Sequence, residues 1–227
     1  MHTQTIYTPT PLIIFDMDET LIAKDLSVLW HHYLVHDLKI AAPDFLAQDK
    51  QHMQRYYQGA MDMDEYIAFS LAPLRPYTVD QIDQFATQFV ASHAAQYIYP
   101  AALDLIERLH RQGKACMIIS ATISLLVKAM AKHLNIEFAE GVELEISNNY
   151  YTGKISGTPS YQRGKVIRLQ QWLESQQGRY KATHFYSDSI NDLPLLLEVP
   201  NPVVINGCPK LTAEAEMRNW IQEKWSL

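Results

Sequence analysis

The feature that most constrains the fold is a short apolar run that ends in two aspartates. Residues 12–15 are Leu-Ile-Ile-Phe, and Asp16 and Asp18 follow one residue apart. Such a run predicts a strand buried on both faces, as in a parallel sheet. Open α/β folds bind their ligands at the carboxyl edge of these strands. Like charges this close repel, so the pair indicates a bound cation or a shared proton. A turn or a helix cap is the simpler alternative.

Length, composition and charge narrow the class of protein. The chain has 227 residues, 48% of them hydrophobic, and a formal net charge of −6. This length suffices for one α/β domain with an inserted subdomain. The acidic balance disfavours a nucleic-acid partner, which needs a basic face. No apolar run approaches the ~20 residues of a membrane span. Residues 1–10 lack the pattern of a secretory signal. We therefore expect a cytoplasmic protein without a membrane partner, either a monomer or a homodimer.

Residues 24–97 carry helix signals and no strand pattern. Ser27 is placed to cap the first helix. Gly59 is typical of a helix end. An all-helical stretch of this length is unusual inside an α/β protein, so we predict that it is an insert. The expected domains are a helical domain at residues 24–97 and a catalytic core made of residues 1–23 and 98–227.

Strands and helices alternate again after residue 97. Residues 114–119 and 182–186 are apolar runs that predict buried strands, and residues 202–205 predict a last short strand. Helical patterns separate these strands, and a polar amphipathic helix is expected to close the chain. This alternation predicts the α/β class with a doubly wound parallel sheet.

The predicted strands end in polar clusters that should meet at one edge of the sheet. Carboxylates, hydroxyls and one lysine together suit a hard cation and a phosphoryl group, and oxygen ligands favour Mg²⁺. No Cys/His cluster has the spacing of a zinc site. Taken singly, Thr122 fits a helix cap better than a ligand, and Asn191 is also explained as a loop-shaping residue. The clusters are Asp16/Asp18, Ser120/Thr122 and Asp188/Asn191/Asp192, and Lys165 opens the helix before the third.

In this order, these clusters resemble the four motifs of the haloacid dehalogenase (HAD) superfamily of phosphatases. The resemblance spans residues 12–206. Ser187 replaces the usual glycine of the fourth motif. Glu19 stands where small-molecule members often carry Gly, Ser or Asn, and it either adds negative charge near the entrance or points to solvent. The matching segments are Asp16-Met17-Asp18-Glu19-Thr20, Ser120, Lys165 and Ser187-Asp188-Ser189-Ile190-Asn191-Asp192.

The resemblance implies a Mg²⁺-dependent phosphomonoesterase. Asp16 would be the nucleophile that forms an aspartyl-phosphate. Asp18 would be the general acid and then the general base. The carboxylates of Asp16 and Asp188 and the backbone carbonyl of Asp18 would hold the metal. The implied phosphate-binding residues are Ser120, Ala121, Lys165 and Asn191, of which Ser120 and Lys165 also count as catalytic, and Thr20 and Asp192 support them.

In this superfamily, an insert between the first and second motifs caps the substrate. The helical insert resembles subfamily IB, the phosphoserine-phosphatase-like group. A β-hairpin predicted in residues 142–155, with its turn at residues 148–149 or 152–153, resembles the same group. Residues 59–74 resemble a branch of bacterial histidinol-phosphate phosphatases. The implied reaction converts L-histidinol phosphate, a small phosphorylated metabolite, to L-histidinol in histidine biosynthesis. The alternative is a phosphoserine phosphatase or another subfamily IB phosphatase.

The resemblance also suggests how the cap would recognise its substrate. Asp25, nine residues after Asp16, matches the acid that holds the substrate amine in phosphoserine phosphatases. Those enzymes bind the substrate carboxylate with a cap arginine, and our mapping places Ser70 there. The alternative is that Asp25 is a solvated loop residue and that Arg55 or Arg75 binds a carboxylate.

We expect the substrate to contact the cap through Asp25, Glu65 and Tyr66. An imidazole ring would stack on an aromatic side chain such as Tyr66 or Phe69. The cap histidines are expected on the surface or in helix packing and not as ligands. These histidines are His31, His32, His36 and His52.

Overall fold

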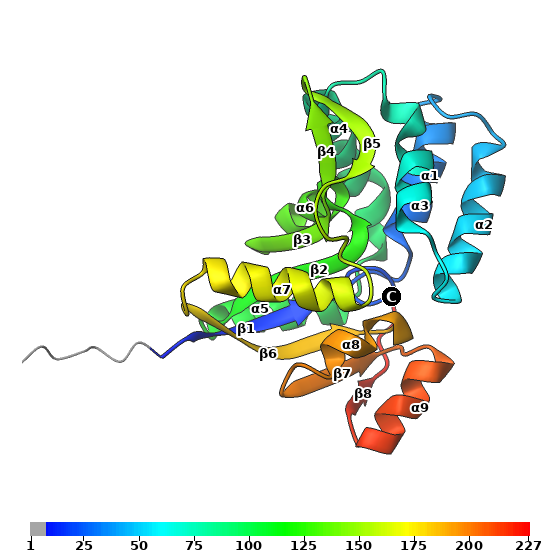
Figure 1. Cartoon of the computed structure of the whole chain (residues 1–227). Coiled ribbons are helices and arrows are strands. Elements are labelled where there is room, and N and C mark those ends of the chain that lie inside the picture. Colours follow the sequence, from blue (N-terminus) through cyan, green and yellow to red (C-terminus); the bar gives the residue numbers. More distant parts are fainter. Residues whose placement is uncertain (1–7) are drawn as a thin grey trace, which may run out of the picture.

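A six-stranded parallel sheet forms the centre of the computed structural model, which describes residues 8–227 (Figure 1). The order is β3-β2-β1-β6-β7-β8, and every neighbouring pair is parallel. The predicted fold class is confirmed. The expectation for residues 1–10 falls mostly outside the described residues. The strands are β1 (Thr10–Phe15), β2 (Ala115–Ile123), β3 (Phe138–Val142), β6 (Tyr180–Ser187), β7 (Asn201–Ile205) and β8 (Ile221–Glu223).

Helices cover both faces of this sheet. Successive side chains of β1 enter different apolar clusters: Ile13 and Phe15 pack on the side of α5 and α6, and Leu12 and Ile14 on the side of α7 to α9. Burial on both faces explains the continuous apolar run in the sequence. No helix within residues 8–227 has the length and hydrophobicity needed to cross a membrane. The helices are α5 (Pro100–Arg111), α6 (Ser124–His133), α7 (Arg163–Ser175), α8 (Leu193–Leu196) and α9 (Pro209–Arg218).

Two strands of the sheet were missed by the sequence analysis, and both lie at its edges. β3 contains Glu140 and Gly141, and the three residues of β8 are all exposed. The side chains of β3 are only partly buried and those of β8 are exposed, so neither strand needs a continuous apolar run. The expectation that a helix closes the chain is wrong, because β8 follows α9 and pairs with β7.

The residues between β1 and β2 form helices that lie together beyond one end of the sheet (Figure 1). Their two connections to the sheet meet in an antiparallel bridge between Ile22 and Ile98. α4 continues as a π-helical turn, Val90–Ala94, and a 3-10 turn, Ala95–Tyr97. The helices are α1 (Leu26–His36), α2 (Phe45–Tyr57), α3 (Met63–Leu71) and α4 (Val79–Phe89).

The start of α1 differs from the prediction. Asp25, not Ser27, is the N-cap, and its carboxylate accepts a hydrogen bond of 3.0 Å from the amide of Val28. Ser27 is buried in the first turn, with its hydroxyl 3.3 Å from that of Thr122. Asp and Ser are about equally good caps, so the sequence could not choose between them.

The predicted hairpin is present as β4 (Leu144–Ser147) and β5 (Tyr150–Ile155). Of the two turns considered, the structure uses Asn148-Asn149, with φ of 51° and 66°. A tight two-residue hairpin turn needs positive φ at both positions, and Asn tolerates it. The hairpin tip docks on the start of α4, because the amide of Val79 donates to the carbonyl of Asn149 at 2.9 Å. The hairpin is therefore attached to the helical insert.

A buried polar network joins α1, α2 and α3. His31 on α1 is fully buried, with Nε2 2.8 Å from the hydroxyl of Ser70 on α3. Its Nδ1 lies 2.8 Å from a carboxylate oxygen of Asp49 on α2. His31 is thus a packing residue, as expected, and Ser70 is committed to this network. The network therefore holds these three helices of the insert together.

We predict that Asp49→Ala will destabilise the protein far more than Asp44→Ala. The first change leaves the buried ring of His31 without its carboxylate, which should lower the free energy of unfolding by about 1–3 kcal/mol. Asp44 is an exposed acid at the start of the same helix, so its loss should cost less than about 1 kcal/mol. Urea denaturation measures both. Equal losses would show that the network does not stabilise the cap.

Candidate active site

Three adjacent strands bring the predicted residues to the carboxyl edge of the sheet. Asp16 directly follows β1, Ser120 lies in β2, and Asp188 directly follows β6. Lys165, in the first turn of α7, places Nζ 2.7 Å from Asp16 Oδ1 and 2.7 Å from Asp192 Oδ1. The structure therefore brings together the residues of all four motifs.

Lys165 is the cation at the centre of this cluster, and only 1% of it is exposed. Burial opposes its charge, but Asp16 and Asp192 raise the pKa of its ammonium above the usual value. Asp192 also accepts a 2.7 Å hydrogen bond from the hydroxyl of Ser187. Ser187 replaces the glycine typical of the motif. Its hydroxyl positions the carboxylate of Asp192, which in turn pairs with Lys165.

Thr20 connects the first and fourth motifs. Its hydroxyl donates to Asp188 Oδ1 at 3.1 Å and accepts from the backbone amide of Asp188 at 3.0 Å. The same oxygen lies 3.5 Å from Asp16 Oδ2. Thr20 is fully buried, so it fixes the separation of the two carboxylates that were predicted as metal ligands.

Asp18 faces the second motif and the helical insert. Its Oδ2 accepts hydrogen bonds from Ser120 at 3.0 Å and Thr122 at 2.8 Å, and its Oδ1 accepts from the amide of Leu26 at 2.6 Å. Burial raises the pKa of Asp18. The interpretation of Thr122 as a helix cap is wrong: Ile123 occupies the N-cap of α6, and Thr122 donates to Asp18. The hydroxyl of Ser160 donates a hydrogen bond to the backbone carbonyl of Ser120 and thereby helps to fix the position of Ser120.

Negative charge is in excess at this edge. Burial raises the pKa of Asp16 to about 7, against the opposing effect of Lys165. Burial and repulsion by Asp16 raise the pKa of Asp188 well above its usual value. Burial and repulsion by Asp18 also raise the pKa of Asp25 well above its usual value. Crowded carboxylates of this kind are made tolerable by a bound cation.

The donor set fits a hard divalent cation that keeps part of its water. Within the described chain, no group of three or more His, Cys, Asp or Glu side chains is arranged to hold a metal. The carboxylates of Asp16 and Asp188 are the side-chain donors that Thr20 links. A site with two carboxylates leaves the other positions to a backbone carbonyl, water and substrate, as Mg²⁺ prefers.

A small pocket lies between these residues and the insert. On the sheet side it is lined by Asp18, Ala121 and Thr122, and Asp25 stands at the junction with the insert. A second hollow beside it is lined by Asp18, Glu19, Asp25 and Asp188. No Arg, Lys or His lines either hollow. The pocket residues that the insert supplies are Ser27, Met53, Tyr56, Met61, Met63 and Tyr66.

Asp25 and Tyr66 therefore reach the pocket, as predicted, and Glu65 does not. Glu65 is exposed and forms an ion pair with Arg55 at 3.2 Å. Asp62 caps α3 by accepting a hydrogen bond from the backbone amide of Glu65, whose side chain is exposed. Phe69 also lies outside the pocket, where its ring stacks on Phe45 at 4.2 Å between centroids.

The arginines considered for carboxylate recognition also lie elsewhere. Arg55 is engaged at the surface by Glu65, and Arg75 packs near Gly153 of the hairpin. Glu19 is exposed and adopts a φ of 55°, and it lines the second hollow. It therefore both meets solvent and adds charge at the entrance.

Asn191, predicted to bind phosphate, has both ends of its amide engaged. Its Nδ2 donates to the backbone carbonyl of Tyr56 at 3.2 Å, and its Oδ1 accepts from Gln162 at 3.4 Å. Tyr56 and Gln162 were missed by the sequence analysis. Helical periodicity shows which face of a helix is apolar, but it does not show which residue at the helix end reaches another part of the chain.

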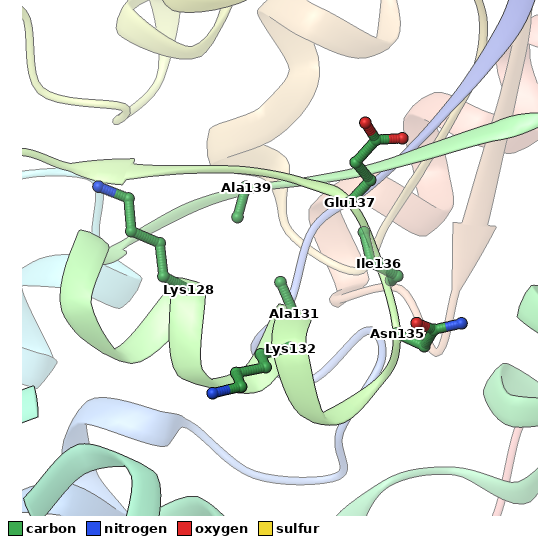
Figure 2. A pocket seen from close by; sticks show the side chains of 7 residues that line it. All are labelled: Lys128, Ala131, Lys132, Asn135, Ile136, Glu137 and Ala139. Atoms are coloured by element: carbon green, nitrogen blue, oxygen red, sulfur yellow. The ribbon is translucent and has the colours of Figure 1, made fainter. Parts of the chain in front are cut away.

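A wider hollow lies elsewhere on the surface, between α6 and β3 (Figure 2). The connection from α6 to β3 lies at the amino edge of the sheet, opposite the carboxyl edge that carries the motifs. Lys128 at its rim forms an ion pair with Glu143 at 3.0 Å. No motif residue lines it, so it is separate from the pocket beside the insert. Its lining is Lys128, Ala131, Lys132, Asn135, Ile136, Glu137 and Ala139.

Known proteins match this chain over most of its length. A family model for haloacid dehalogenase-like hydrolases matches residues 13–197. The histidinol-phosphatase of Neisseria meningitidis is 36% identical over 214 residues, which cover 92% of this chain and 96% of that protein. The phosphoserine phosphatase of Lactococcus lactis is 30% identical over 185 residues, 82% of this chain and 78% of that protein.

A solved structure agrees over a similar length. The crystal structure of a protein with unknown function from Bordetella pertussis superposes with a TM-score of 0.86 and 28% sequence identity. The superposition covers 95% of this chain and 98% of the other. Core, insert and hairpin therefore recur together in another bacterial protein.

Proposed function

We propose that this chain, which belongs to the haloacid dehalogenase-like hydrolase family and is a phosphatase, acts on L-histidinol phosphate with the help of Mg²⁺. The observation that carries the substrate proposal is the charge of the pocket. Asp25 lines it next to Asp18, and no cationic side chain does. In the same proposal, residues 24–97 are a cap that covers the substrate.

In the first chemical step, a carboxylate oxygen of Asp16 attacks phosphorus and forms the aspartyl-phosphate bond. The bond from phosphorus to the ester oxygen breaks, and the leaving oxygen takes a proton from Asp18. Lys165 holds Asp16 at 2.7 Å, so the nucleophile has a fixed position. The raised pKa of Asp18 supports its role as the acid.

In the second step, a water molecule attacks the phosphorus of the aspartyl-phosphate and gives its proton to Asp18. Phosphate leaves, and Asp16 regains its carboxylate. The hydroxyl of Ser120, the amide of Ala121 and the ammonium of Lys165 would bind the phosphoryl oxygens in both steps. Donors fixed in a buried site stabilise the transition state because they need no rearrangement.

Mg²⁺, when bound, would neutralise phosphoryl charge and hold the substrate in line with the nucleophile. The carboxylates of Asp16 and Asp188 and the carbonyl of Asp18 would hold it. Thr20 would support this site, because its hydroxyl donates a hydrogen bond to Asp188 and keeps the Asp188 carboxylate near Asp16. Asp192 serves it by holding Lys165.

The pocket favours a substrate that carries an amine and no carboxylate. An ammonium group beside Asp25 forms a charge-assisted hydrogen bond. A buried substrate carboxylate would find no cation in either hollow, which is costly. Methionine and tyrosine side chains form the remaining walls, and they suit a flat heteroaromatic ring such as imidazole. Phosphoserine has the carboxylate that this pocket does not match, although one relative with that name, from Lactococcus lactis, is 30% identical.

We predict that Asp16→Asn will lower turnover of p-nitrophenyl phosphate by several orders of magnitude with little change in folding. The amide keeps the shape of the side chain but removes the anionic oxygen. Steady-state kinetics and thermal denaturation measure the two effects. Activity within about tenfold of wild type, a barrier change of only ~1.4 kcal/mol, would remove Asp16 from the nucleophile role.

EDTA should abolish the activity and Mg²⁺ should restore it, because oxygen ligands predominate at the site. Asp188→Ala should raise the Mg²⁺ concentration needed for half-maximal activation by a larger factor than it changes folding stability. Titration of metal-stripped enzyme with MgCl₂ provides the measurement. Full activity in the metal-stripped protein contradicts the metal role.

The substrate proposal predicts a kcat/KM for L-histidinol phosphate at least about tenfold above that for L-phosphoserine, since one unpaired buried group costs ~1–3 kcal/mol. Asp25→Asn should lower kcat/KM for L-histidinol phosphate far more than for p-nitrophenyl phosphate, which has no amine. Asn remains a good N-cap, so α1 should be retained. A preference for phosphoserine, or equal losses on both substrates, rejects the proposal and leaves the phosphatase.

A further inference from the structure

Tyr56, at the end of α2, stands where the insert meets the catalytic edge. It lines the pocket and the second hollow, and it shares both with Asp18 and Asp25. Its ring lies 5.6 Å from that of Tyr161, which precedes α7. The end of α2 thus projects between the residues of the first motif and the loop that leads to Lys165.

Side-chain amides of the core hold this helix end in place. Asn191 donates to the carbonyl of Tyr56 at 3.2 Å, and Gln162 donates to the carbonyl of Gly59 at 3.3 Å. The carbonyl of Tyr56 lies in the last turn of α2 and also accepts the backbone amide of Gly59 at 2.9 Å, and the carbonyl of Gly59 lies two residues beyond the helix. Asn191 belongs to the fourth motif and Gln162 lies three residues before Lys165, so the contacts join the insert to the reacting centre itself.

The backbone is shaped for these contacts. Gly59 has a φ of +73°, and a Cβ there would lie 3.3 Å from Asn191 Oδ1 and 3.4 Å from Gln162 Nε2. Gln162 has a φ of 50° and ψ of −123°, a conformation that favours glycine. A non-glycine residue in such a position is strained, and strain of this kind concentrates at functional sites.

The surroundings of Tyr56 suit a hydroxyl that donates. Burial raises the pKa of the phenol well above its usual value, and the nearby carboxylates, Asp16 foremost, add to this effect. The phenol therefore keeps its proton near neutral pH. A neutral donor in the hollows that Asp18 and Asp25 also line fits an oxygen of a phosphoryl group, and hydrogen bonds to a charged acceptor are the strong ones.

We propose that Tyr56 is a phosphate-binding residue supplied by the insert: its hydroxyl donates to a phosphoryl oxygen of the substrate at Asp16, and Gln162 and Asn191 position it there. The inference rests on the phosphatase chemistry proposed above but not on the identity of the leaving group. It also gives Asn191 a role, since its amide acts on the phosphate through Tyr56.

Tyr56→Phe is the central test, because it removes the hydroxyl and keeps the ring. Its kcat/KM should fall about tenfold or more, and by the same factor for p-nitrophenyl phosphate and L-histidinol phosphate, which carry the same phosphoryl group. The Kd of inorganic phosphate in the presence of Mg²⁺, measured by calorimetry, should rise by several-fold. Tyr150→Phe is the matched control: this tyrosine of β5 is 42% exposed and lines neither hollow, and its variant should stay within about twofold of wild type.

Three results would overturn the proposal. These are unchanged kinetics and phosphate affinity in Tyr56→Phe, a loss confined to L-histidinol phosphate, and an equal loss in Tyr150→Phe. The second result would assign the hydroxyl to the leaving group. If L-histidinol phosphate proves not to be a substrate at all, the measurements with p-nitrophenyl phosphate and inorganic phosphate still decide the role of Tyr56. The substrate proposal then fails separately.

Gln162→Gly tests the positioning role. Glycine relieves the backbone strain, so the Tm should not fall, while the hydrogen bond to Gly59 is lost. KM for both substrates and the Kd of inorganic phosphate should rise a few-fold, with a smaller change in kcat. An unchanged KM and Kd would remove Gln162 from the positioning role. A lowered Tm with unchanged affinity would show that the residue acts on stability alone.

Discussion

The buried ammonium of Lys165 is the interaction on which the site depends. It lies between the carboxylates of Asp16 and Asp192, with its side chain almost completely enclosed. Removing one member of such a group leaves an uncompensated buried charge, which is strongly destabilising. The parallel order β2-β1-β6 is what allows this arrangement, because it brings Asp16 and the loop after β6 side by side and leaves α7 to supply the lysine.

The first helix of the insert is tied to the catalytic edge through Asp18. The carboxylate of Asp18 accepts a hydrogen bond from the backbone amide of Leu26, the first residue of α1. Free amides and the helix dipole make a helix start a favourable place for an anion. The side chains of Ser27 and Thr122 meet next to it. The proposed acid and the first cap helix therefore hold each other in position, in the same way that Asn191 and Tyr56 do at the end of α2.

The sequence predicted the parts of the site that depend on local patterns at strand ends. Asp16, Ser120 and Asp188 follow or lie in buried strands, and parallel topology then determines that they meet. The sequence contains no comparable signal for residues on the insert. Helical periodicity predicts which face of a helix is buried, but it does not predict which of its residues contact the core. Glu65 was therefore placed in the pocket although it lies on the surface, and Tyr56 was missed. The edge strands escaped prediction because β3 is only partly buried and β8 is exposed, so neither has a continuous apolar run.

Asp25 has both a structural and a proposed binding role. One oxygen of its carboxylate caps α1 by accepting the amide of Val28, and the same side chain lines both hollows next to Asp18. A ligand residue that is also a helix cap has its backbone and one oxygen fixed before any substrate arrives, so less conformational freedom is lost on binding. The same helix start orients Asp18 through Leu26. A substrate amine held by Asp25 would thus be placed relative to the proposed acid by one rigid element, and its ester oxygen would lie within reach of that acid.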